Sequence, residues 1–102
     1  MKTSLHNYDI QRILKKGKRI VADKLTVVYE TNNDKKKRYA VLVPKRKVKK
    51  SSERNKVRRI IREAVRTSDI PLSLFVVLCT GKTYTYDGVS RSLKKITNDI
   101  ID

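Results

Sequence analysis

The chain has 102 residues, and its 26 lysine or arginine residues against 10 aspartate or glutamate residues give a formal net charge of +16 at pH 7. This length suits one domain with a modest core, and we assign residues 1–102 to a single domain. No apolar run is long enough to span a membrane, and the one cysteine, Cys79, excludes an internal disulfide. We therefore expect a cytoplasmic protein without a membrane segment, in which Cys79 is a buried small hydrophobe.

The first part of the chain predicts one helix and then three strands. Apolar spacing predicts a helix from about residue 6 to Lys16, with Gly17 as its left-handed stop. The inner face of this helix consists of Ile10, Ile13 and Leu14. β-prone runs predict strands at 18–22, 24–31 and 38–44. Turn residues and charge predict a hairpin loop at 32–37, between the second and third strands.

The second part predicts a helix, a strand and a last helix. KRKVKK at 45–50 is a connection, after which Ser51 or Ser52 caps a helix that ends between Thr67 and Ile70. The nearly continuous apolar run at 72–80 is typical of an inner strand covered on both sides. Asp87 or Thr85 opens the last helix. The order α-β-β-β-α-β-α predicts an α+β sandwich, a mainly antiparallel sheet with helices packed on it.

The helix that contains RNKVRRIIREAVR, residues 54–66, has two distinct faces. Its apolar residues recur at helical spacing and predict one buried stripe. They are Val57, Ile60, Ile61, Ala64 and Val65. Arginines follow one another at every fourth position, with an asparagine and a further arginine on their flank. The pattern predicts a rigid rod that docks by one face and presents guanidinium groups from the other.

Positive charge is concentrated around this helix. Residues 35–66 contain fifteen lysines or arginines and two glutamates, whereas a solvated surface usually mixes the two signs. Guanidinium groups match phosphate, and the apolar stripe is needed for the core rather than for a membrane surface, so nucleic acid is the favoured partner. We predict RNA contacts from the helix and from the preceding connection. The predicted residues are Arg54, Asn55, Arg58, Arg59, Arg62 and Arg66, with Lys45, Arg46, Lys47, Lys49 and Lys50.

Other side chains leave open alternatives or predict no chemistry. Asn55 either contacts a ribose or base edge or bonds to the local backbone. Tyr29 and Tyr39 either stack on unpaired bases or are ordinary half-buried sheet residues. His6 stands alone, the acidic residues form no pairs, and Gly81-Lys82-Thr83 lacks the preceding glycine of a phosphate loop. We predict no catalytic residue and no protein-held metal.

The stretch VPKRKVKKSSERNKVRRIIREAVR, residues 43–66, resembles the bacterial ribonuclease P protein component. That family has a strand, a basic connection and then Arg-Asn-x-x-Lys/Arg-Arg-x-x-Arg-Glu on a helix. The matching residues are Arg54, Asn55, Arg58, Arg59, Arg62 and Glu63. KKGKR at 15–19, the aromatic Tyr29 and the element order extend the resemblance over nearly the whole chain. The chain departs from the family where Lys49, Ser51 and Ser52 replace Gly and Ala-Val, and where Ile10 and Leu14 replace phenylalanines.

The resemblance implies a fold and a function. The fold is a split β-α-β sandwich with a left-handed crossover, the opposite of the usual hand. The function is that of the protein subunit of ribonuclease P, a tRNA-processing endonuclease that removes the 5′ leader of precursor tRNA. The RNA subunit would do the chemistry, with Mg²⁺ held mainly by RNA and substrate, and the protein alone would be inactive.

The resemblance also implies two binding surfaces on the protein. The arginine helix would bind the RNA subunit, one protein to one RNA. The single-stranded leader would lie in a cleft between the sheet and the first helix, which implies contacts from Tyr29, Tyr39, Ile10 and Leu14. Two alternatives are a ribosomal or other structural RNA-binding protein without a role in tRNA processing, and a DNA-binding module that uses 54–66 as a recognition helix. Arginines at nearly every outward position leave little for reading base edges, which disfavours DNA.

Overall fold

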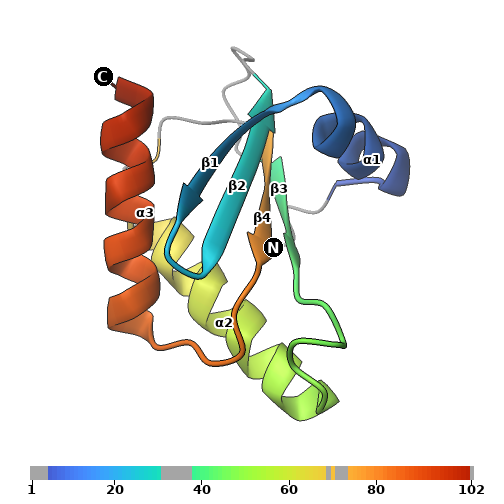
Figure 1. Cartoon of the computed structure of the whole chain (residues 1–102), viewed down its shortest axis with the longest axis vertical. Coiled ribbons are helices and arrows are strands. Elements are labelled where there is room, and N and C mark those ends of the chain that lie inside the picture. The colour runs from blue at the N-terminus through green and yellow to red at the C-terminus, as the bar shows by residue number, and fades with distance from the viewer. Residues whose placement is uncertain (1–4, 31–37, 69, 71–73, 102) are drawn as a thin grey trace.

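The computed structural model describes residues 5–30, 38–68, 70 and 74–101, and this part of the chain forms three helices and four strands in the predicted order (Figure 1). The elements are α1 (Asn7–Lys16), β1 (Lys18–Ala22), β2 (Leu25–Glu30), β3 (Arg38–Leu42), α2 (Ser51–Thr67), β4 (Leu74–Cys79) and α3 (Tyr86–Ile101). None of the helices in these ranges is long and apolar enough to cross a membrane.

The four described strands form one sheet in the order β1-β2-β4-β3. β2 pairs antiparallel with β1 and with β4, whereas β3 pairs with β4 in parallel. The mainly antiparallel sheet is therefore confirmed. The predicted hairpin between the second and third strands is wrong, because β4 separates β2 from β3; its loop at 32–37 lies outside the described residues. β4 takes the inner place because its side chains are apolar on both faces.

The β3–α2–β4 unit joins two parallel strands through the arginine helix. The two strands are direct neighbours, with Tyr39 opposite Phe75 and Val41 opposite Val77. No other strand lies between them, so the split arrangement that the resemblance implied is wrong on this point. A parallel pair needs a crossover connection, and α2 supplies it. The left hand of this crossover stays a prediction.

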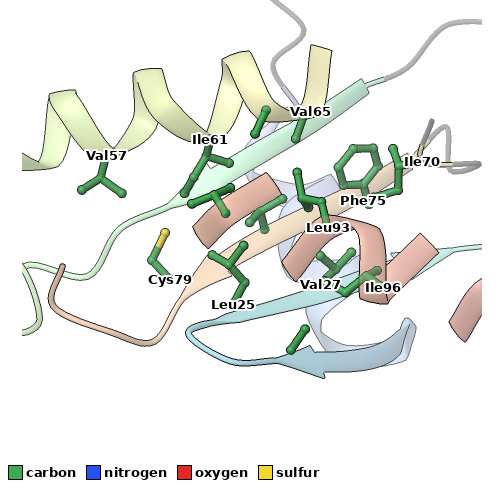
Figure 2. Close-up of a cluster of buried hydrophobic side chains, with 14 of the residues drawn as sticks. Leu25, Val27, Val57, Ile61, Val65, Ile70, Phe75, Cys79, Leu93 and Ile96 are labelled. Carbon is green, nitrogen blue, oxygen red and sulfur yellow. The ribbon is translucent and has the colours of Figure 1, made fainter. Parts of the chain in front are cut away.

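Side chains alternate between the two faces of the sheet and give the protein three layers. On one face the sheet packs against α2 and α3, and Figure 2 shows Ile61 and Val65 of α2, Phe75 of β4, and Leu93 and Ile96 of α3 in this core. On the other face the sheet packs against α1. The buried residues of this second cluster are Leu5, Ile13, Val28, Leu74 and Val76. Figure 1 shows α1 and α3 on opposite sides of the sheet.

The ends of the two long helices test the predicted caps. α2 begins at Ser51 with Lys50 as its N-cap, and no side chain caps it. The prediction that Ser51 or Ser52 caps the helix is wrong, because both lie in its first turn. For α3, the Thr85 hydroxyl accepts a hydrogen bond from the Gly88 N–H at 3.1 Å, which confirms the Thr85 alternative.

Gly17 ends α1 in a different way from the one expected. Its φ of −73° and ψ of 163° are extended, so the predicted left-handed stop is wrong. A Cβ at this position would lie 2.6 Å from the Ile13 carbonyl oxygen and 2.8 Å from that of Tyr29. Glycine is therefore required where α1 meets β2 because there is no room for a Cβ atom, and not because of its backbone conformation.

Candidate nucleic-acid interface

The arginine row of α2 winds around the helix. A step of four residues turns about 40° further than one full turn, so successive members of the row face different directions. Arg54 and Arg58 are half-buried at the edge of the core, whereas Arg62 and Arg66 are exposed. The predicted inner stripe is confirmed, since Val57, Ile61, Ala64 and Val65 are buried and Ile60 is half-buried against the same core.

Several side chains of the row bond to other groups of the same helix region. Arg54 Nη1 donates to the carbonyl oxygens of Val48 at 3.0 Å and Lys49 at 2.8 Å. Arg58 Nη1 donates to Asn55 Oδ1 at 3.2 Å. The side-chain oxygen of Asn55 therefore faces a neighbouring arginine, and neither predicted alternative describes this bond. Asn55 as a whole is exposed.

Arg66 forms an ion pair with Glu63 one turn earlier. The hydrogen bond from Arg66 lowers the pKa of the Glu63 carboxyl, and the same bond raises the pKa of Arg66. Both groups are solvent-exposed, so the pair adds little to stability. Its main effect is to hold the Arg66 guanidinium beside a carboxylate that partly cancels its charge.

Arg59 and Arg62 are the outward arginines that remain open to a partner. Both are exposed, and neither makes a hydrogen bond or an ion pair with any residue in the described ranges. Arg59 points about 160° away from the fully buried Ile61 and Arg62 about 100° away, so both lie outside the buried stripe. This geometry presents two guanidinium groups to an external anion while the helix is held by its other side.

The connection at 45–50 forms a second basic element at the N-terminal end of α2. The backbone N–H groups of Lys47 and Val48 donate to the Pro44 carbonyl oxygen at 3.0 and 3.1 Å. The side chain of Val48 is 2% exposed and joins the core. The charged side chains around this anchor are all exposed, namely Lys45, Arg46, Lys47, Lys49 and Lys50. The lone valine in a basic run was the signal for this anchor, and the sequence analysis missed it.

The four residues implied to contact a leader do not lie together. Tyr29 and Tyr39 are half-buried and pack on the cluster shared with α2 and α3, where Phe75 lies between them in register. Ile10 and Leu14 are half-buried in the cluster on the α1 side. The sheet separates the two pairs, so the implied placement of all four residues in one cleft is wrong. The alternation of strand side chains places odd-numbered β2 and β3 residues away from α1.

The α1 face keeps half-buried apolar surface next to charged groups. Ala40, Leu42 and Leu78 are half-buried on this face, beside α1. Arg12 of α1 bridges to Asp9 at 3.0 Å and to Glu30 of β2 at 3.1 Å. Ion pairing with Glu30 raises the pKa of Arg12, as Asp9 does to a smaller extent. The bridge ties α1 to β2, and the described residues that pack in the cluster around Ile10 and Leu14 are all aliphatic.

The described residues contain no group of three or more His, Cys, Asp or Glu side chains that could hold a metal ion. The anchored arginine helix, the basic connection and the sheet that supports them define a class: a basic α+β protein that presents an ordered cationic surface to a polyanion.

Comparison with known proteins identifies the family within this class. The family described as Ribonuclease P matches residues 4–100, and the chain belongs to this family of ribonuclease P protein components. The ribonuclease P protein component of Ureaplasma parvum serovar 3 is 30% identical over 82 residues, which are 80% of this chain and 73% of that protein. The corresponding protein of Coxiella burnetii is 27% identical over 92 residues, covering 90% and 76% of the two chains.

Solved structures agree with the fold. The RNase P protein of Staphylococcus aureus has a TM-score of 0.78 with 25% identity, over 98% of this chain and 96% of that one. The RNase P protein of Thermotoga maritima has a TM-score of 0.80 with 24% identity, over 94% and 96%, and shows the fold alone. The predicted α+β architecture, the element order and the resemblance are thereby confirmed.

Proposed function

We propose that this chain binds the RNA subunit of a bacterial ribonuclease P through α2 and the 45–50 connection, in a 1:1 complex, and assists removal of the 5′ leader from precursor tRNA. The observation that carries the proposal is the outward pair Arg59 and Arg62 on a helix whose opposite face is fully docked. Family membership supports RNA as the polyanion. The complex would act in the cytoplasm.

In this proposal the RNA subunit carries the chemistry, with Mg²⁺ held by the RNA and the substrate. The protein contributes charge neutralisation, which reduces repulsion when two RNA molecules meet. Its anchored helix provides this charge without a large ordering cost.

The leader of the substrate would lie along the α1 face of the sheet. The surface there is aliphatic, with Ile10 and Leu14 beside Leu42 and Leu78. Exposed Lys15 and Lys16 in the last turn of α1 supply positive charge for its phosphates. We propose that charge and aliphatic contact, and not ring stacking, hold the leader, and that the two tyrosines of the opposite face do not take part.

Reconstitution tests the proposal. The protein, a bacterial ribonuclease P RNA and a precursor tRNA are combined with Mg²⁺ at low salt, and cleavage is measured with and without protein. The protein should increase cleavage and should show none without the RNA. The gain should be larger for a leader of several nucleotides than for a leader of one. An RNA that co-purifies with the protein and proves to be ribosomal would contradict the proposal.

A further inference from the structure

Arg54 is the first member of the arginine row, yet its side chain is used inside the protein. Its Nη1 donates to the carbonyl oxygens of Val48 and Lys49. The side chain is half-buried, whereas that of Arg62, two turns later, is exposed. Identical residue types in one row therefore have different environments, and their roles need separate tests.

The carbonyl groups of Val48 and Lys49 lie just before the first residue whose carbonyl oxygen accepts a backbone hydrogen bond of α2. The Arg54 N–H donates to the Lys50 carbonyl oxygen at 3.0 Å, which is the first backbone bond of the helix. Val48 and Lys49 precede that bond, and the guanidinium supplies their carbonyl oxygens with a charged donor. Hydrogen bonds from a charged donor are stronger than neutral ones. Arg54 thus fixes the entry of the connection into the helix.

The other end of the connection is fixed as well. The Pro44 carbonyl oxygen accepts bonds from Lys47 and Val48, and the Val48 side chain is buried. The exposed cations of the connection are therefore attached to a backbone held at both ends. A segment that is ordered before it binds loses less conformational freedom on association.

We infer that Arg54 is a positioning residue: it holds residues 45–50 in the conformation that contacts RNA and does not itself neutralise a phosphate. The inference rests on the proposed function, because it assigns Arg54 a part in RNA binding. It differs from the sequence-based prediction, in which Arg54 contacts RNA directly.

The test compares Arg54→Ala with the matched control Arg62→Ala. Amide hydrogen exchange at Lys47 and Val48 is measured in the free proteins. Affinity for a bacterial ribonuclease P RNA is then measured over a series of salt concentrations. Arg54→Ala should speed exchange at these two amides by about tenfold, which corresponds to losing charged hydrogen bonds. Arg62→Ala should leave their exchange unchanged.

The salt series separates positioning from contact. A lost phosphate contact lowers the slope of log affinity against log salt by about 0.7–0.9, and we expect this for Arg62→Ala. Arg54→Ala should weaken affinity by about tenfold at every salt concentration with the slope unchanged. A reduced slope with unchanged exchange would make Arg54 a direct contact, and faster exchange with unchanged affinity would make its role purely local; both overturn the inference. If the wild-type protein fails to bind the RNA, the proposed function fails, and the exchange data still show whether Arg54 orders the connection.

Discussion

The Tyr39 ring stacks on the Phe75 ring, with centroids 5.1 Å apart and ring planes 5° apart. Phe75 is fully buried, so the stack places Tyr39 against the core shared with α2 and α3. A ring in this position stabilises the sheet and faces away from α1. Its contribution should therefore appear in stability and not in leader binding.

Tyr39→Leu should lower the free energy of unfolding by about 0.5–1.5 kcal/mol, the usual contribution of an aromatic pair. Urea denaturation measures this change. Tyr8→Leu is the control: the Tyr8 side chain is 68% exposed and its ring stacks on the exposed His6, so its loss should change stability less than loss of the stack on the buried Phe75. A Tyr39→Leu protein of normal stability that loses affinity only for substrates with a long leader would contradict the assignment.

Mutations on the two faces of α2 should have different effects, one on stability and the other on RNA binding. Ile61→Ala should cost about 2–5 kcal/mol of stability, because Ile61 is fully buried and its loss leaves a cavity. Arg59→Ala, on the opposite face, should change stability by less than about 0.5 kcal/mol and weaken RNA binding. Thermal unfolding and RNA titration on each variant check the pair. Comparable unfolding in both would show that the faces are wrongly assigned.

Gly17→Ala should destabilise the protein by about 1–3 kcal/mol, as overpacking does. The added Cβ would meet two backbone carbonyl oxygens, those of Ile13 and Tyr29, and neither can move without shifting α1 or β2. Gly88→Ala is the control: its Cβ would meet the Thr85 hydroxyl at 3.1 Å, and alanine favours the helix. Equal stability changes in the two variants, measured by denaturant unfolding, would refute the steric argument at Gly17.

Tyr84 links stability to alkaline pH. Burial raises the pKa of Tyr84 from 10.0 to about 12, against a smaller lowering by the Gly81 N–H, which donates to its hydroxyl at 2.7 Å. The folded state thus favours the neutral phenol. This stabilisation is complete below pH 10 and is lost as pH rises from 10 towards 12. The stability difference between wild type and Tyr84→Phe should be constant from pH 7 to 9 and shrink above pH 10.

Denaturant unfolding at each pH checks this difference, and comparison with a variant cancels the titration of the lysines. Tyr8→Phe serves as the control, because this phenol is exposed. A difference that stays constant up to pH 11 would show that the Tyr84 phenol is not held neutral by the fold.

RNA binding by the wild-type protein should depend strongly on salt. Log affinity should fall by about 0.7–0.9 per neutralised phosphate against log salt. Six phosphate contacts would thus weaken binding by about a thousandfold between 50 and 200 mM salt. The double variant Arg59→Ala/Arg62→Ala should reduce the slope by about 1.4–1.8. An affinity that barely changes with salt concentration would show that this basic surface does not bind the RNA.

Local patterns predicted the elements and failed where distant segments meet. The stripe from Val57 to Val65 depends on the helix period alone, and the structure confirms it. Strand period alone likewise places Tyr39 and Val41 on one face of the sheet and Ala40 on the other. The apolar run of β4 indicated an inner strand, but no local signal showed that β4 inserts between β2 and β3 and so becomes the neighbour of β3. The sequence suggested that Gly17 is a left-handed helix stop. The real reason for glycine, the close approach of the Tyr29 carbonyl oxygen, could not be predicted because it exists only once β2 has folded onto α1.

The candidate interface divides in the same way. Charge density and helical spacing predicted which residues surround the outward face of α2, including Arg59 and Arg62. Spacing alone could not predict that Arg54 turns back to the carbonyl groups of Val48 and Lys49. Each step of four residues turns the side chain about 40° further around the helix. The rotation accumulates along the row, so the first arginine meets its own chain and the last ones meet solvent.

The position of β4 in the sheet has a consequence for synthesis of the chain. β4 is the last strand to be translated, yet it lies between β2 and β3 and is the only described neighbour of β3. While the ribosome makes residues 1–73, the arginine helix has no complete surface to dock on. We expect the nascent chain to keep this basic segment undocked until residues 74–79 leave the exit tunnel, so folding should come late in translation. Pulse proteolysis of stalled chains ending before and well beyond residue 79 would show the change.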